Sequence, residues 1–407
     1  MGFLSLPPVT PTLLRALTRN SGLMRSELQL ATGASGATIA RVTMELSDAG
    51  LLSVSTGVAN GKGRPAETIS LAEDGLCTIG VSIRTEQCVA SLITFQGECI
   101  ASEYPDVNEE TPYVQAIGRI GNAVLRLAAK AADSFRALGC VSIIFFGSCS
   151  YEHGEITTPS TFQAWHHKPI AHDLARYTAL PCAVMNYSFA LVATLNWFSE
   201  QDFDDFFIAL DDYSIGGMCS IHGEPYLPYG VKPSSFSHTN SRRIGKELCR
   251  CGGYDCLSVT SSVRAIRAEA GRQGLISPGR TDFANLIRDL DGHDDPRARL
   301  LLDSAGAAVA RAALNVCRGI GFRICIFGGL LFDCSAAARE AAQKEFYAPG
   351  HSCATRFLSD VFHGKDIDNL TAAALCCHHL SKTRQAYLLD KQQDYVEILT
   401  RQGASQG

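Results

Sequence analysis

Three cysteines and one histidine form a close group of potential metal ligands in the sequence. Cys249, Cys251 and Cys256 are separated by one and then four residues, and His238 lies eleven positions before the first of them. Three thiolates and one imidazole complete the tetrahedral shell of structural zinc sites, with no position left for a reactive water. The spacing therefore predicts a closed, structural Zn2+ site. The alternative interpretation is a loop of three free thiols, which oxidise readily when they are exposed.

The rest of the composition describes a folded protein of more than one domain. The chain has 407 residues, of which 46% are hydrophobic and 19% charged, and its net charge is -5. This length exceeds what a single core usually organises, and the composition excludes wholesale disorder. No apolar run reaches the ~18 to 20 residues that cross a bilayer, and the N-terminus lacks the regions of a signal peptide. We therefore expect a cytoplasmic protein without membrane segments. Most of the 16 cysteines lie within apolar runs and are expected to be buried, as at Cys88, Cys140, Cys219 and Cys325.

The N-terminal segment predicts three short helices followed by a β-hairpin. Apolar residues recur every three or four positions between Pro11 and Gly50, and a break falls at Gly33. Ser35 is a suitable N-cap for the third helix. Beyond Gly50 the pattern changes to strands at residues 51–55 and 67–71, joined by a basic, glycine-rich tip. This order of elements is typical of a winged helix-turn-helix.

In such a domain the third helix reads DNA, because its N-terminal residues face base edges and phosphates. Leu28, Ile39 and Val42 fall at inward positions of this pattern. Residues 1–64 carry six basic and three acidic side chains, which gives a local charge of +3 within an acidic protein. The alternative is a three-helix protein-interaction module with an incidental hairpin. The side chains expected to contact double-stranded DNA are Arg25, Ser35, Ala37, Thr38 and Arg41, with Lys62 and Arg64 at the wing tip.

From Leu76 onward, strand and helix patterns alternate along the chain. This alternation is typical of an α/β protein with helix-covered sheets. We expect strands at residues 78–83, 89–95, 141–146, 182–185, 206–210, 218–221 and 324–327. We expect helices at residues 112–132, 189–198, 262–270, 296–317, 335–345 and 369–380. Residues 382–407 are polar and glutamine-rich, which predicts an added helix or a frayed tail.

Motifs in both halves of the chain resemble those of the ROK family, which contains sugar kinases and sugar-responsive repressors. In the first half, residues 24–28, Thr32-Gly33, 37–41 and Gly63-Arg64-Pro65 follow the order seen in the repressors. In the second half, His238, Cys249-Arg250-Cys251-Gly252 and Cys256-Leu257 resemble the family's zinc signature. The resemblance covers about residues 11–380. It implies an α/β fold with an N-terminal winged helix-turn-helix and a two-lobed, actin-like and ribonuclease-H-like ROK domain. The expected boundaries are 1–75 for the DNA-binding domain, 76–195 for lobe 1, 196–380 for lobe 2 with the zinc loop, and 381–407 for a C-terminal extension.

Compared with the kinases of this family, the residues for phosphoryl transfer are altered. The first phosphate turn of the kinases has an Asp followed by Gly-Gly-Thr, where this chain has Ser82 and then Arg84-Thr85-Glu86. The second turn has three alternating glycines in the kinases, whereas residues 214–218 read Ser-Ile-Gly-Gly-Met, and we expect the bulk of Met218 to obstruct it. Tyr187 replaces the catalytic Asp, and a phenol with an ordinary pKa near ~10 is a poor base at neutral pH. Two glutamates beside the zinc signature are replaced by Ser235 and Ser258. The sequence therefore predicts a pseudokinase that is not an enzyme.

The resemblance also implies an effector site and an oligomer. Asn186 and His238 match polar pocket residues of the family, where the histidine bears on both metal and sugar, and Tyr187 is a further candidate contact. The expected effector is a sugar or a derived metabolite, although the amide of Asn186 serves a loop backbone equally well. We expect a homodimer or homotetramer that binds a roughly palindromic operator as a repressor or activator. The alternatives are an ATP-dependent sugar kinase with an unorthodox site and a regulator controlled by a protein partner.

Overall fold

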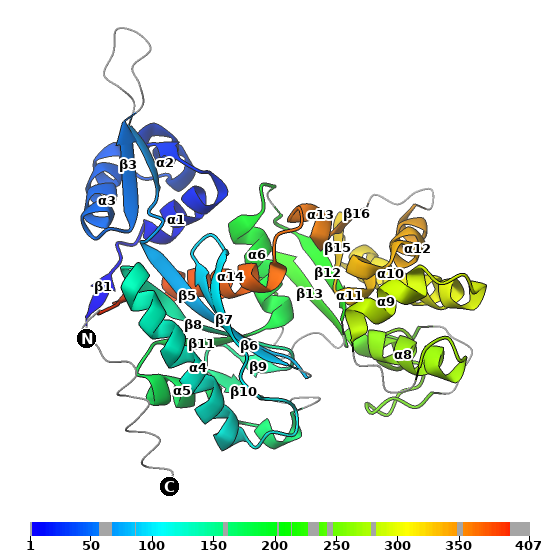
Figure 1. The fold of residues 1–407 in the computed structure, drawn as a ribbon. Coiled ribbons are helices and arrows are strands. Elements are labelled where there is room, and N and C mark those ends of the chain that lie inside the picture. Colours follow the sequence, from blue (N-terminus) through cyan, green and yellow to red (C-terminus); the bar gives the residue numbers. More distant parts are fainter. Residues whose placement is uncertain are drawn as a thin grey trace. The chain divides into compact units, whose positions relative to one another are not determined.

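The computed structural model describes residues 2–56, 67–85, 87–157, 162–201, 203–212, 214–226, 236–241, 247–277, 282–347 and 353–390. The chain divides into two compact units, Met1–Gln201 with Asp366–Gly407, and Asp202–Lys365 (Figure 1). The expected second lobe began at residue 196 and ended at residue 380. By its contacts, the second unit instead ends at Lys365, and the chain then returns to the first unit.

A winged helix-turn-helix head forms the N-terminal part of the first unit. Gly33 ends its second helix in the left-handed conformation, at φ 67°, and Ser35 caps its third helix by accepting a hydrogen bond from the Thr38 backbone N–H at 3.2 Å. The predicted helices and hairpin are confirmed, and a short strand, β2, completes a three-stranded sheet in the order β2-β4-β3. The elements are α1 Thr10–Arg19, β2 Leu23–Met24, α2 Arg25–Thr32, α3 Gly36–Asp48, β3 Leu52–Thr56 and β4 Glu67–Leu71.

The large sheet of the first unit has seven strands in the order β1-β17-β8-β5-β6-β7, with β11 also paired to β8. The pairs β5-β8 and β8-β11 are parallel, whereas β5, β6 and β7 form an antiparallel meander. Helices α4 and α5 share a core with one face of the sheet, whereas α14 packs on β5 and β8, and α6 packs against α14. The elements are β1 Phe3–Ser5, β5 Leu76–Ile83, β6 Cys88–Thr94, β7 Cys99–Glu103, α4 Tyr113–Ser134, β8 Ala137–Phe145, β9 Cys149–Ser150, β10 Glu155–Ile156, α5 Ile170–Thr178, β11 Cys182–Asn186, α6 Tyr187–Phe198, α14 Ile367–Thr383 and β17 Gln385–Leu388.

The alternation of side chains along β5 explains how helices cover both faces of this sheet. Ile79 and Val81 enter the core beneath α4. Between them, Gly80 faces α14, where an added Cβ atom would lie 2.6 Å from the Ala372 Cβ. The absence of a side chain therefore lets α14 lie directly on the sheet.

The C-terminal part of the first unit differs from the sequence-based expectation. The helix expected in the second lobe at residues 369–380 is α14, and it packs on the first sheet because the glycine surface of that sheet accommodates it. Residues 385–388, expected in a helix or a frayed tail, form β17, which pairs with both β8 and the N-terminal strand β1. Leu6 N–H also donates to the Arg384 carbonyl at 2.8 Å. The strand β1, which precedes the head in the chain, is therefore an edge strand of the large sheet. Residues 391–407 of the expected extension lie outside the described ranges.

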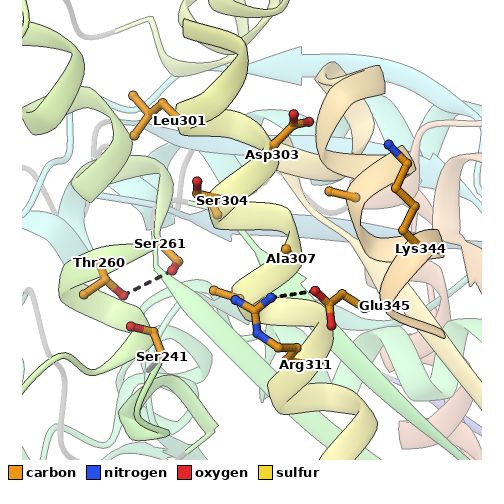
Figure 2. A pocket seen from close by; sticks show the side chains of 13 residues that line it. Ser241, Thr260, Ser261, Leu301, Asp303, Ser304, Ala307, Arg311, Lys344 and Glu345 are labelled. Atoms are coloured by element: carbon orange, nitrogen blue, oxygen red, sulfur yellow. Dashed lines mark hydrogen bonds and ion pairs between the residues drawn. The ribbon is translucent and has the colours of Figure 1, made fainter. Parts of the chain in front are cut away.

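The second unit contains a five-stranded sheet in the order β14-β13-β12-β15-β16. Its longest helix, α10, is capped by Asp295 and ends at Gly321, which has φ 93°. Within the described ranges, α10 is the helix long and apolar enough to cross a membrane, but it is mostly buried and serves as a core helix. Small residues on α10 leave a hollow of about 470 Å3 between α10 and its neighbours (Figure 2). The elements are β12 Phe206–Asp211, β13 Ile215–Ile221, β14 Glu224–Pro225, α7 Leu257–Thr260, α8 Val263–Arg272, α9 Phe283–Asp291, α10 Pro296–Ile320, β15 Ile324–Gly328, α11 Leu330–Cys334, α12 Ala336–Phe346, β16 Ala354–Phe357 and α13 Leu358–Val361.

Candidate metal site and DNA-binding surface

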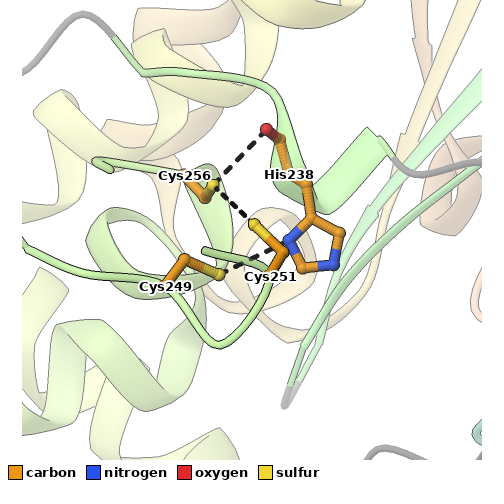
Figure 3. A group of neighbouring side chains, drawn as sticks. All are labelled: His238, Cys249, Cys251 and Cys256. Carbon is orange, nitrogen blue, oxygen red and sulfur yellow. Dashed lines mark hydrogen bonds between the residues drawn. The ribbon is translucent and has the colours of Figure 1, made fainter. Parts of the chain in front are cut away.

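The four predicted metal ligands converge in the second unit (Figure 3). The Cys249 Sγ lies 3.4 Å from the His238 Nδ1, and the Cys251 Sγ lies 3.6 Å from the Cys256 Sγ. All four ligand atoms are within 4.8 Å of one another. A tetrahedral zinc with bonds of about 2.3 Å to sulfur requires ligand separations of about 3.8 Å. The donor set and its spacing therefore fit a structural zinc ion bound through Nδ1 and three thiolates.

Backbone hydrogen bonds in the loop Leu248–Cys256 explain why these ligands meet. The Cys249 N–H donates to the Gly253 carbonyl at 2.8 Å, and Gly252 adopts a left-handed conformation at φ 87°, so that the chain reverses between the second and third cysteines. The Leu257 N–H then donates to the Thr239 carbonyl at 2.9 Å. This last bond holds the turn that carries His238 against the loop Leu248–Cys256, and the two are called the histidine turn and the cysteine loop below.

The pKa values of two cysteines in the group are shifted in opposite directions. Burial raises the pKa of Cys249, but hydrogen bonds from the Cys251 backbone and the Ser258 hydroxyl outweigh it and lower the pKa to about 6. Burial and the neighbouring thiols Cys251 and Cys249 raise the pKa of Cys256 to about 12. Thiolates this close repel one another unless a cation lies between them. The hydroxyl of Ser258, where the resemblance implied a glutamate, lies 3.4 Å from the Cys249 Sγ and so supports a ligand.

The predicted DNA contacts on α3 form one exposed surface. Ser35, Ala37 and Arg41 are exposed, and the Ser35 and Thr38 hydroxyls are 2.9 Å apart. The Arg41 Nη1 pairs with the Glu45 Oε1 at 2.7 Å, one helical turn away. Met44, which the sequence reasoning missed, is also exposed on α3, with 58% of its surface accessible. The N-terminal half of α3 therefore presents small, hydroxyl and basic groups to solvent.

The other predicted DNA contacts are only partly described. Arg25 Nη1 pairs with Glu67 Oε2 at 3.0 Å, which connects the start of α2 to the wing strand β4. The Arg25 side chain of this pair is 44% exposed, so phosphate oxygens can compete for the arginine. Lys62 and Arg64 at the wing tip lie outside the described residues.

The predicted effector residues Asn186 and Tyr187 lie at the junction of β11 and α6 in the first unit, whereas His238 belongs to the second. The Asn186 Oδ1 accepts the Ser188 N–H at 2.9 Å and its Nδ2 donates to the Gly147 carbonyl at 2.7 Å. Both ends of the amide therefore serve backbone groups, which favours the capping interpretation. Tyr187 is 9% exposed, and its ring stacks on Phe146 at 4.2 Å between centroids.

A cluster that the sequence reasoning missed fills the first phosphate turn. The Arg84 Nη2 contacts both carboxylate oxygens of Asp368 at 2.8 Å, and the guanidinium lies 3.9 Å from the Phe146 ring centroid and 5.6 Å from that of Tyr187. The resemblance to the kinases implies a glycine at the position of Arg84, so a side chain covers the backbone that was expected to approach a phosphate. Glu86, which was expected to repel phosphate, lies outside the described residues.

The second phosphate turn differs from the expectation in one residue. Met218 is 1% exposed and pairs with Ile208 within the sheet, so its side chain belongs to the core and does not obstruct the turn. Asp211, which precedes the turn, is fully buried, and its Oδ1 accepts the Val263 N–H at 3.1 Å. Burial raises the pKa of Asp211 well above its usual value. Ser235, the other expected loss near the zinc loop, lies outside the described residues.

The fold and these sites define a protein with a winged helix-turn-helix head and a two-lobed, kinase-like α/β body. The chain belongs to the ROK family, whose model matches residues 78–357. The expected family and fold class are therefore confirmed.

Individual relatives include both kinases and a regulator. The chain is 25% identical over 265 residues to a glucokinase of Thermotoga maritima, a match that covers 62% of this chain and 81% of that protein. It is similar in structure to a ROK family transcriptional regulator described as a homologue of the E. coli Mlc protein, with TM-score 0.72 and 18% identity over 93% of this chain and 98% of that one. It is also similar to a ROK family glucokinase from Streptomyces griseus solved with glucose and AMPPNP, with TM-score 0.57 and 21% identity over 73% of this chain and 98% of that one.

Proposed function

We propose that this protein is a cytoplasmic DNA-binding transcriptional regulator of the ROK type, whose kinase-like body does not transfer phosphate. The observation that carries the proposal is the winged helix-turn-helix head, in which one face of the N-terminal half of α3 presents the half-buried Thr38 and the exposed Arg41. A helix N-terminus presents unpaired N–H groups and a positive dipole end to phosphates, while side chains of its first turns reach base edges. As a homodimer or homotetramer, the protein would place two such helices on a palindromic operator.

The altered residues of the first phosphate turn support the absence of kinase activity. Phosphoryl transfer requires a general base and close backbone approach to the phosphates. The resemblance places Tyr187 at the position of the base, and the Arg84 side chain, paired with Asp368, covers the first turn. A side chain that already pairs with a carboxylate offers phosphate a site only after that pair is broken.

A sugar kinase is the second candidate function, because the similarity to the Thermotoga glucokinase covers most of that protein. An assay of ATP consumption with a panel of hexoses separates the two functions. The regulator proposal predicts no sugar-dependent turnover by the full chain. Turnover that Tyr187→Phe or Arg84→Gly alters would establish the kinase.

A structural zinc ion completes the proposed protein. His238, Cys249, Cys251 and Cys256 would hold it, and the ion would supply a cross-link between the histidine turn and the cysteine loop. The effector of the regulator would be a sugar or a derived metabolite. The Asn186 amide already forms hydrogen bonds with two backbone groups and is therefore a weaker candidate for binding an effector. Control of the regulator by a protein partner is the alternative.

The recognition surface can be tested by fluorescence anisotropy with a DNA site selected by the full chain. Thr38→Ala with Arg41→Ala is expected to weaken binding at least ~10-fold, because a direct base contact contributes about 1–3 kcal/mol. The melting temperature is expected to stay unchanged, since the Ser35 cap to the Thr38 backbone N–H remains. Arg126→Ala, which removes the same charge from the exposed face of α4, serves as the control. Unchanged DNA binding by the double variant would remove α3 as the recognition helix.

A further inference from the structure

The hollow over α10 in the second unit has the size and lining of a small-molecule site. Its volume of about 470 Å3 lies within the range of about 300–1,000 Å3 found for ligand pockets. Ser304, Ala307 and Ala308 of α10 line its base, and their small side chains keep the space open. Figure 2 shows three hydroxyl side chains on one side of α10 and Lys344 and Glu345 on the other. The hollow is therefore polar at both ends, with a mostly apolar helix face between them.

One end of the hollow is lined by three buried side chains that carry hydroxyl groups. Ser241, Thr260 and Ser261 are 7%, 5% and 2% exposed. The Thr260 hydroxyl donates to the Cys256 carbonyl at 3.1 Å and lies 3.1 Å from the Ser261 hydroxyl. A hydroxyl group both donates and accepts hydrogen bonds, which suits this end to the hydroxyl groups of a ligand.

The opposite end of the hollow carries the charged side chains of Lys344, Glu345 and Arg311. Arg311 Nη1 pairs with Glu345 Oε1 at 2.5 Å, and Asp303 lies 3.9 Å from the Arg299 guanidinium. Lys344 has no ionic partner among the described residues, although it lines the same hollow. An ammonium group in this position attracts an anion, while the Arg311–Glu345 pair beside it offers both donors and acceptors.

We propose that this hollow binds an anionic polyol, a sugar phosphate or a sugar acid. The hydroxyl groups of the ligand face Ser261 and its neighbours, and its charged group faces Lys344. The site is separate from Asn186, Tyr187 and His238, and the proposal does not depend on DNA binding. The floor of the hollow is continuous with the cysteine loop, because Thr260 bonds to the Cys256 carbonyl and the Ser241 N–H donates to the Asp255 carbonyl at 2.9 Å. A bound ligand therefore also restrains this loop.

Isothermal titration calorimetry on the full chain without DNA tests the site. The probes are a hexose 6-phosphate, the matching sugar acid, the neutral hexose and inorganic phosphate. At least one anionic polyol is expected to bind tenfold or more tightly than the neutral hexose and phosphate, and the tighter of the two identifies the class of charged group. Lys344→Met is expected to remove this margin. Lys365→Met, which removes an exposed lysine elsewhere in the same unit, is expected to retain it.

A second variant and a second measurement locate the binding. Ala307→Trp fills the hollow and is expected to abolish binding, while hydrogen exchange of the backbone from Cys256 to Ser261 slows only when wild-type protein binds the ligand. Equal binding of the anionic polyols by wild type and Lys344→Met overturns the proposal, as does the absence of any preference for them over the neutral hexose. If wild type binds no polyol and Ala307→Trp changes the oligomeric state, the hollow is an interface between copies of the chain, which also overturns it.

Discussion

Removal of one ligand from the cysteine loop should release zinc without disturbing the cores. Cys251 is the exposed thiol of the group, so Cys251→Ser removes a metal ligand and little packing. Structural zinc binding contributes about 10–16 kcal/mol, or about 2.5–4 kcal/mol for each of four ligands when shared equally. Since about 1.4 kcal/mol is a factor of ten, the variant should bind zinc at least ~60-fold more weakly. Cys99→Ser, which changes an exposed thiol of the first unit, should bind zinc as wild type does.

The assay has two parts. Metal analysis of protein purified under reducing conditions should find about one zinc per chain, and competition with a chromogenic chelator should then give the affinities of wild type, Cys251→Ser and Cys99→Ser. Wild-type protein that retains no zinc would refute the site. Equal zinc affinities for Cys251→Ser and wild type would show that the geometric convergence of these ligands is incidental.

Three further predictions concern groups that the fold buries or pairs. Arg84→Ala should lower the free energy of unfolding in urea by about 1 kcal/mol, because it removes a partly exposed ion pair and a ring contact. The control Arg126→Ala should lower it by less than about 0.5 kcal/mol. Equal losses for the two variants would contradict the prediction. Burial, followed by the charges of Lys382 and His379, lowers the pKa of His378 to about 4. The unfolded chain therefore takes up a proton that the folded chain refuses, and stability falls as the pH drops from about 6.5 to about 4, by about 2 kcal/mol at about pH 5; His378→Phe should flatten this decline, and an unchanged profile would count against it. Burial raises the pKa of Asp211. The unfolded chain therefore loses a proton that the folded chain keeps, and stability falls as the pH rises. Asp211→Asn should raise the melting temperature more near about pH 8 than near about pH 4, and the opposite order would contradict a buried neutral carboxyl.

Local patterns explain which parts of this structure could be predicted from the sequence. The head follows from short-range signals, because Gly33 ends a helix, Ser35 caps the next one, and apolar spacing defines each inner face. The metal ligands were also predictable, since their chemistry is rare and Cys249 to Cys256 lie in one loop. In both cases the determining contacts join residues close together in the chain.

Contacts between distant residues explain what could not be predicted. Arg84 and Asp368 are 284 positions apart, and nothing in either local sequence indicates that one will cover the first phosphate turn by binding the other. The strand β17 was missed because its partners, β8 and β1, are also distant in sequence. Met218 was assigned an obstructing role from its size, whereas strand alternation directs it into the core.

Selection of bound sequences from a randomised pool of double-stranded DNA tests the central claim most directly. The full chain, loaded with zinc, should enrich one motif with two half-sites in roughly dyad arrangement, since two recognition helices related by two-fold symmetry read it. Thr38→Ala with Arg41→Ala should fail to enrich that motif. Folded, zinc-loaded wild-type protein that enriches no motif would contradict the assignment of this ROK family member as a DNA-binding regulator.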